Sequence, residues 1–133
     1  MKRIMLIILA SLMLITAGCG SEVSVVIPLI NPPSITASQF SQDTVHRFVD
    51  GSIDFFAPDS DLDTMTISVT DSRGFGVVRT VTDLIAFRGQ SRGTITFSID
   101  YLTYPPDTYT IAIHLTDRAG LISNPVFISF RVP

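Results

Sequence analysis

The chain has 133 residues and a formal net charge of −3, a length that suits one domain and is short for two. Lys2 and Arg3 lie at its start, and the residues beyond position 18 hold seven Arg, no Lys and twelve acidic residues, for a net charge of about −5. This balance argues against a nucleic-acid-binding stripe and against a polybasic membrane patch. The single Cys excludes an intrachain disulfide.

The first 18 residues predict a secretory signal peptide. Residues 1–3 are short and basic, and residues 4–17 form an apolar run that only Ser11 and Thr16 interrupt. A membrane-spanning helix needs about 20 apolar residues. The run is therefore too short to span a bilayer well and is typical of the signal of an exported protein.

The residues that end this run resemble the lipobox of bacterial lipoproteins. They read Thr16, Ala17, Gly18 and Cys19, with Thr16 at the position where the family prefers Leu. The resemblance implies cleavage between Gly18 and Cys19 and a lipid anchor that includes palmitate on Cys19. Gly20 follows where Asp would favour retention at the inner membrane, so the resemblance also implies the cell outer membrane. The alternatives are an ordinary signal peptide that is cut near a free Cys, and an uncleaved anchor.

Residues 19–33 are predicted to comprise the lipidated Cys and a tether. The tether is rich in Val, Ile and Leu between positions 23 and 30, and these side chains would be costly to leave in water as one patch. Either part of the run adds an edge strand to the following domain, or it lies against the membrane or a partner. Asn31, Pro32 and Pro33 mark the boundary, because prolines stiffen and turn the chain there.

Residues 34–133 predict a seven-stranded, antiparallel, two-sheet immunoglobulin-like sandwich, because short alternating runs are separated by turn residues every eight to twelve positions. Residues 40–46 are predicted to be polar loop, and residues 83–93 to be a second loop. The predicted strands cover residues 35–37, 52–56, 64–70, 77–81, 95–99, 109–115 and 126–132.

The clearest of these strands follows two prolines. Pro105 and Pro106 favour a turn, and from Tyr109 onward apolar residues alternate with polar ones up to position 116. A Tyr directly after such a turn resembles the tyrosine corner of immunoglobulin-like and fibronectin type III sandwiches, which implies that its hydroxyl bonds to backbone upstream. Residues 104–124, together with residues 57–71, also resemble bacterial immunoglobulin-like repeats of surface proteins. This resemblance implies a fold and no activity. The fibronectin-type arrangement implies that the third and sixth strands are neighbours.

The sharpest polar cluster is Asp59, Asp61 and Asp63. Carboxylates at alternate positions of an extended loop can converge on Ca²⁺, which takes six to eight oxygen ligands. The spacing is not that of an EF-hand loop. A cadherin-like calcium site is one interpretation, with Asp117 or Asn124 approaching from the loop between the last two strands. The other is a solvated acidic turn whose side chains bond local backbone.

A second candidate is the positive charge in the middle of the chain, on Arg73, Arg79, Arg88 and Arg92. Arg pairs with phosphate and carboxylate groups in a fork, so an anionic glycan or lipid headgroup would suit such a binding patch. The alternative is that these side chains are solvated and balance nearby Asp residues.

No catalytic constellation is visible in the sequence. His46 and His114 are far apart and neither has a metal-ligand neighbour at short spacing, and there is no strained Gly-x-Ser-x-Gly elbow. We therefore expect no enzyme activity and no cofactor other than the calcium considered above. The predicted function is a lipid-anchored envelope module that binds a partner protein through the sandwich edge or the tether. The alternative is a module that binds calcium or a glycan through the loops at one end.

Overall fold

The computed structural model describes Gly20 and residues 31–133. The predicted signal peptide, Cys19 with its cleavage site, and most of the tether lie outside the described residues. No helix in the described part of the chain is long and apolar enough to cross a membrane. The described elements are seven strands and one short 3-10 helix: β1 (Ser34–Asp43), β2 (Phe48–Phe56), β3 (Leu62–Thr70), β4 (Gly76–Asp83), η1 (Ile85–Phe87), β5 (Arg92–Asp100), β6 (Asp107–Asp117) and β7 (Val126–Val132).

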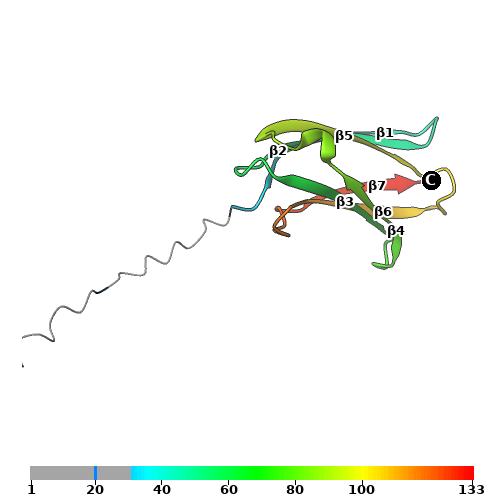
Figure 1. Cartoon of the computed structure of the whole chain (residues 1–133). Coiled ribbons are helices and arrows are strands. Elements are labelled where there is room, and N and C mark those ends of the chain that lie inside the picture. The colour runs from blue at the N-terminus through cyan, green and yellow to red at the C-terminus, as the bar shows by residue number, and fades with distance from the viewer. Residues whose placement is uncertain (1–19, 21–30) are drawn as a thin grey trace, which may run out of the picture.

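The strands form two antiparallel sheets that pack face to face (Figure 1). One sheet has three strands in the order β1-β2-β5, and the other has four in the order β4-β3-β6-β7. The predicted seven-stranded, two-sheet antiparallel sandwich is therefore confirmed, and so is the predicted pairing of the third and sixth strands, β3 and β6.

The core lies between the sheets and follows the period-two pattern of the sequence. Every second residue of β6 from Tyr109 to Leu115 is buried, and the facing residues of β3, Met65 to Val69, are buried as well. Phe97 and Val126 pack against this core while remaining partly exposed. The alternation in the sequence therefore identified the core face of the central strands.

The prediction of a loop over residues 40–46 was wrong for residues 40–43, because β1 continues to Asp43 and pairs with β2 along its length. Residues 44–46 lie in the turn between β1 and β2, as predicted. The strand lies at the edge of its sheet, so β2 alone satisfies its ladder hydrogen bonds. Of its ten residues only Ile35 is buried. A strand that buries so little side-chain surface needs no apolar alternation, which is why its polar sequence resembles a loop.

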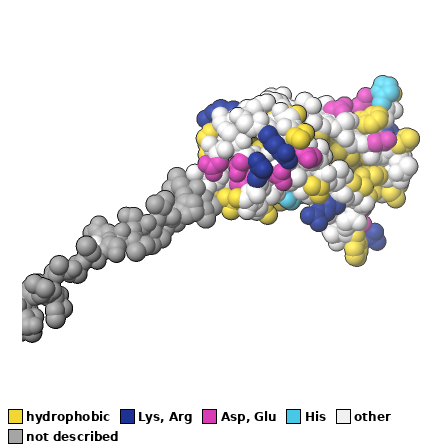
Figure 2. Space-filling model, viewed as in Figure 1, with side chains coloured by type: hydrophobic (Ala, Val, Ile, Leu, Met, Phe, Trp, Pro, Cys, Tyr) yellow, Lys and Arg dark blue, Asp and Glu magenta, His cyan; other side chains and the backbone are white. Residues whose placement is uncertain are grey.

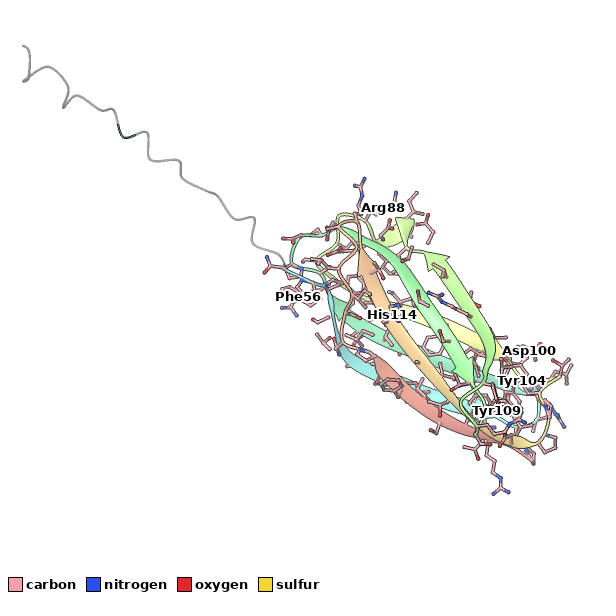
Figure 3. The ribbon with its side chains drawn as sticks, turned by 90° about the horizontal axis from the view of Figure 1, so that it is seen from below. Phe56, Arg88, Asp100, Tyr104, Tyr109 and His114 are labelled. Carbon is pink, nitrogen blue, oxygen red and sulfur yellow. The ribbon has the colours of Figure 1, made fainter. Side chains whose placement is uncertain are left out.

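The connections gather at two ends of the sandwich. The end where β1 begins, which we call the N-terminal end, holds loops 57–61, 84–91 and 118–125 (Figures 1 and 3). The opposite end, which we call the far end, holds loops 44–47, 71–75 and 101–106. At the far end the Tyr109 hydroxyl donates to the carbonyl oxygen of Pro105 at 2.8 Å. This is the hydrogen bond that the resemblance to the tyrosine corner implies.

Candidate functional site

The two open sides of the sandwich differ, and the β1/β7 side is closed by side chains. Asn124 Oδ1 accepts the backbone N–H of Ile35 at 2.8 Å, and Asn124 Nδ2 donates to the carbonyl of Ile35 at 3.0 Å. Farther along, Gln42 Nε2 donates to the carbonyl of Arg131 at 2.7 Å and to the Tyr101 hydroxyl at 3.0 Å. These side chains occupy backbone groups of both edge strands, so this side has fewer free groups to offer another chain.

The opposite side, between β4 and β5, has a groove of about 550 Å³. Its floor is apolar and comes from both sheets, with Met65, Ile67 and Val69 on β3 and Ile99 on β5. Its rim holds Val78, Thr80 and Thr82 of β4, residues 96–98 and Asp100 of β5, and Thr103 and Tyr104 of the loop that follows. The groove therefore combines apolar surface with two sheet edges.

Strand β4 forms one of these edges and is unusually uncovered. It pairs with β3 alone, and all eight of its residues are exposed, including Val81 with 57% of its surface exposed. Natural edge strands are commonly protected by Pro, Lys or a central bulge. Here the sequence holds no Pro or Lys, and the one irregularity in its pairing lies at its start, where Thr70 pairs with Gly76. The sequence predicted this strand but not its exposure. The only signal of the exposure is weak: two apolar residues, Val77 and Val78, are adjacent instead of alternating with polar ones.

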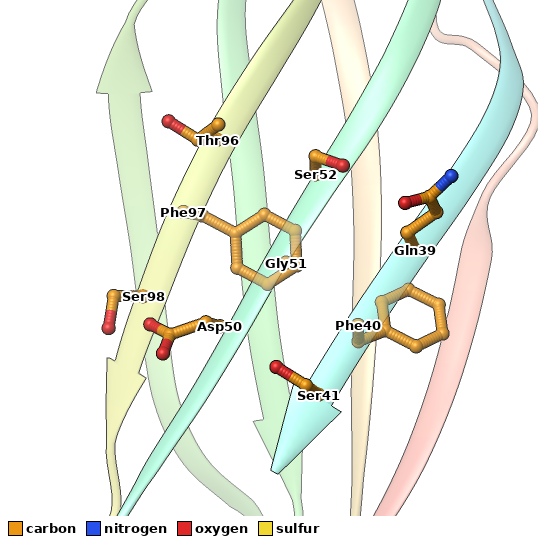
Figure 4. A pocket seen from close by; sticks show the side chains of 9 residues that line it. All are labelled: Gln39, Phe40, Ser41, Asp50, Gly51, Ser52, Thr96, Phe97 and Ser98. Carbon is orange, nitrogen blue, oxygen red and sulfur yellow. The ribbon is translucent and has the colours of Figure 1, made fainter. Parts of the chain in front are cut away.

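A second hollow, of about 670 Å³, lies over the middle of the β1-β2-β5 sheet (Figure 4). The register places Phe40, Gly51 and Phe97 in one row across the three strands. The remaining lining residues are polar: Gln39, Ser41, Asp50, Ser52, Thr96 and Ser98. Asp50 is the one titratable residue among those that line the hollow. This lining therefore does not provide a pair of acid and base groups.

The acidic residues of the predicted calcium site lie at the N-terminal end but do not converge fully. Asp63 is drawn away by Arg88, whose guanidinium lies 3.2 Å from its carboxylate. Asn124 is occupied by the backbone of Ile35. Among the described residues no three His, Cys, Asp or Glu side chains form a group that could hold a metal ion.

Asp61 and Asp117 are the members of the predicted set that interact. Asp117 is 2% exposed, and its Oδ1 accepts the N–H of Leu121 at 2.8 Å, while its Oδ2 is buried without a hydrogen-bond partner. Partial burial raises the pKa of Asp61, and the negative charges of Asp117 and then Asp59 raise it further. The loop is tied together by a backbone hydrogen bond from Arg118 to the carbonyl of Asp61. Negative charge therefore gathers here, and the positive charge of Arg118, which lowers the pKa of Asp61, offsets only part of it.

The four Arg residues of the predicted binding patch are spread along the sandwich. Arg73 is in the far-end turn, where it pairs with Asp71 at 2.7 Å and lies over the ring of Phe75. Arg79 is in the middle of β4, on the exposed edge.

The other two are at the N-terminal end, where basic and acidic side chains lie close together on the left of the sandwich in Figure 2. Arg88 pairs with Asp63 and lies 3.6 Å from Asp83, and Arg92 stacks on Phe56 at 4.5 Å from the ring centre. Arg73 and Arg88 therefore balance nearby Asp residues, which agrees with the alternative to a binding patch given in the sequence analysis.

The two histidines lie at different places on the described part of the sandwich. His46 Nδ1 lies 2.7 Å from Asp43 Oδ2 in the exposed β1–β2 turn, where Asp43 also accepts the N–H groups of Val45 and His46. Hydrogen bonds from His46 lower the pKa of Asp43. His114 faces Thr66 across the β3–β6 ladder, on the face of the sheet that points away from the core. The acidic partner of His46 thus has a local structural role in the turn.

No protein-family model matches the chain, and no curated protein matches it. Among solved structures, the crystal structure of wild-type OgpA from Akkermansia muciniphila is similar, with a TM-score of 0.60 and 14% sequence identity over 77% of this chain and 28% of that chain. The PKD domain of a peptidase from a Thermoplasmatales archaeon matches with a TM-score of 0.47 and 14% identity, over 77% of this chain and 97% of that one. At this identity the likeness to OgpA shows the fold alone: an immunoglobulin-like sandwich.

Proposed function

We propose that this protein is a non-catalytic module of the cell envelope, anchored by lipid on Cys19, that binds a partner protein along the β4/β5 side of its sandwich. The observation that carries the proposal is the difference between the two sides. Side chains close the β1/β7 side, whereas β4 is exposed over its whole length beside an apolar groove. Unpaired strands recruit other strands through main-chain hydrogen bonds.

The groove beside β4 can add specificity to the binding of such a strand. Main-chain pairing along an edge supplies affinity with little sequence preference, whereas pockets for alternate side chains supply specificity. A strand added beside β4 would point every second side chain toward Val78, Thr80 and Thr82, which line the groove. An extended partner segment with alternating apolar residues therefore fits this side.

Site-specific photocrosslinking in intact cells tests the proposal. The full chain would carry a photoreactive phenylalanine at Thr82, on β4, or at Ser41, on β1, since both are exposed strand residues. We expect Thr82 to give a discrete adduct with an envelope protein, at a yield several times that from Ser41. Equal yields from the two positions, or a higher yield from Ser41, would contradict the assignment of the β4/β5 side.

A second candidate function is calcium binding at the N-terminal end, and one observation favours it. The buried, unpartnered Oδ2 of Asp117 lies in the electrostatic reach of Asp61, and a bound cation would compensate both charges. A site with a Kd near 1 mM would contribute about 1.4 kcal/mol in 10 mM calcium, and would raise the unfolding midpoint of a domain of this size by about 4–10 °C. An unchanged midpoint in calcium and in chelator would remove this candidate.

A further inference from the structure

We propose that one partner of the β4 edge is a second copy of this chain, paired through β4 across a two-fold axis. The inference rests on the proposed function, because it names an occupant for the same edge. It starts from the composition of β4, Gly76–Asp83, which has one basic residue near its middle and one acidic residue at its end. Such a strand can meet its own copy in antiparallel orientation with opposite charges brought together.

The pleat of the sheet restricts how the two copies align. Thr80 and Thr82 of β4 line the groove, and so face the core side of the sheet, whereas Arg79, Val81 and Asp83 alternate with them and face the outer side. Residues directly opposite each other in an antiparallel pair share a face. A two-fold axis perpendicular to a shared sheet therefore passes between one residue and the same residue of the other copy. Two successive residues, which point to different faces, cannot lie opposite each other across the axis.

Two residues lie at the middle of β4 and qualify for this position. With Arg79 opposite its own copy, two like charges would meet directly, which is destabilising. With Thr80 opposite its own copy, residues 77–83 of each strand pair, and a Thr–Thr pair lies on the axis. Cross-strand Thr–Thr pairs are favourable. The register centred on Thr80 is therefore the one that the strand favours.

Charge complementarity supports the same register. With Thr80 on the axis, Arg79 of one copy is opposite Val81 of the other, and its two diagonal neighbours on the outer face are Asp83 and Arg79 of that copy. The pair of strands therefore has two attractive contacts between Arg79 and Asp83 and one repulsive contact between the two Arg79 side chains. Diagonal neighbours lie about 7–8 Å apart at the backbone, within reach of long side chains. Arg79 and Asp83 are both exposed, and the two-fold axis makes the contact twice. The result would be a continuous eight-stranded sheet.

A symmetric disulfide tests the register directly. Directly opposite residues have Cα atoms about 4.5–5.5 Å apart, within the range that a disulfide bridges. We expect the full chain with Thr80→Cys to form a disulfide-linked dimer in membranes under mild oxidation, and the parent chain in parallel reports any bridge through Cys19. The matched control is Val78→Cys, because its copy would lie four residues away along the strand, about 13 Å. A Val78→Cys dimer that forms as fast as the Thr80→Cys dimer would overturn the register.

A charge swap tests the contact between Arg79 and Asp83. In the Thr80→Cys chain, Arg79→Asp is expected to lower the yield of dimer about fivefold or more, and adding Asp83→Arg to restore it. An unchanged yield would overturn the pairing. Thermal unfolding of each variant shows that the domain is still folded. If Thr80→Cys forms no dimer while photocrosslinking from Thr82 still captures a different envelope protein, the second copy is excluded and the proposed function stands. Failure of both removes both.

Discussion

The side chain of Asn124 pairs with both backbone groups of Ile35, accepting its N–H at 2.8 Å and donating to its carbonyl at 3.0 Å. The two residues are 89 positions apart in the chain, and they join the start of β1 to the loop that precedes β7. The primary amide thus takes the place that a neighbouring peptide group would have at this edge. It links the two sheets and blocks the start of the β1 edge at once.

We predict that Asn124→Ala destabilises the domain by about 1–2 kcal/mol, because it leaves a partly buried N–H and carbonyl of Ile35 without their partner. The midpoint of thermal unfolding should fall by about 4–12 °C. Asn124→Asp is the comparison, since it keeps an acceptor for the N–H but near neutral pH sets a carboxylate oxygen against the carbonyl of Ile35 in place of the donor, so it should be destabilised as well. An Ala variant as stable as the parent would show that this pairing contributes nothing.

Tyr109 provides a second test, on the hydroxyl that bonds to Pro105. Tyr109→Phe keeps the buried ring, which stacks on Phe130 with centroids 5.5 Å apart, and removes the hydrogen bond. We expect a loss of about 1 kcal/mol in the free energy of unfolding. Tyr104→Phe is the control, because the hydroxyl of Tyr104 donates no hydrogen bond to another described residue. Denaturant unfolding measures both, and equal stabilities of the two variants would contradict the role of the corner.

Gly51 is required by the ring beside it. A Cβ at this position would lie 2.3 Å from Cζ of Phe97, so Gly51→Ala must displace a ring that covers part of the core. We predict a loss of about 1–3 kcal/mol. Combining it with Phe97→Leu should cost less than the sum of the two single losses, because the smaller side chain makes room. Gly76→Ala, where nothing lies within 4 Å, is the control and should change stability little. Additive losses would show that the ring of Phe97 is not the cause of the loss in Gly51→Ala.

Asp61 yields a prediction whose sign depends on calcium. Burial and the charges of Asp117 and Asp59 raise the pKa of Asp61 above 3.8, so the folded state holds this proton more tightly than the unfolded state does. The ionised carboxylate therefore lowers stability at neutral pH, and the penalty disappears as the pH falls below 3.8, where both states are protonated.

In chelator at pH 7, Asp61→Asn should raise the unfolding midpoint by about 1–4 °C, and the gain should vanish near pH 3. If the loop binds calcium, the same variant should lose the calcium-dependent rise. Asp59→Asn, at an exposed position, is the comparison and should gain less in chelator. A midpoint that falls in chelator at neutral pH would contradict the repulsion between Asp61 and Asp117.

The central strands were predictable because they bury one face. In β3 and β6 the alternation of Met65, Ile67 and Val69 with polar residues is local, and it appears directly in the sequence. β1 was not predictable along its length, because an edge strand with one buried residue carries no such alternation.

The difference between the β1/β7 side and the β4/β5 side also could not be predicted from the sequence, for another reason. It depends on contacts such as that of Asn124 with Ile35, which join residues 89 positions apart, and no local pattern reports them. The exposure of β4 has the same origin, because the three-stranded sheet provides no strand to cover it. In the acidic loop, the calcium interpretation expected Asp117 or Asn124 to approach, and Asp117 does interact with Asp61. The ion pair between Arg88 and Asp63 had no local signal in the sequence.

The placement of the first and last strands has a mechanical consequence. β1 begins at the N-terminal end and β7 ends at the far end, in different sheets (Figure 1). A force that pulls the two ends of the domain apart would therefore run along the strands, perpendicular to the ladder hydrogen bonds. The bonds of β1 with β2, or those of β7 with β6, would be loaded in shear and would have to break together rather than one after another. A domain built in this way resists extension along its strands.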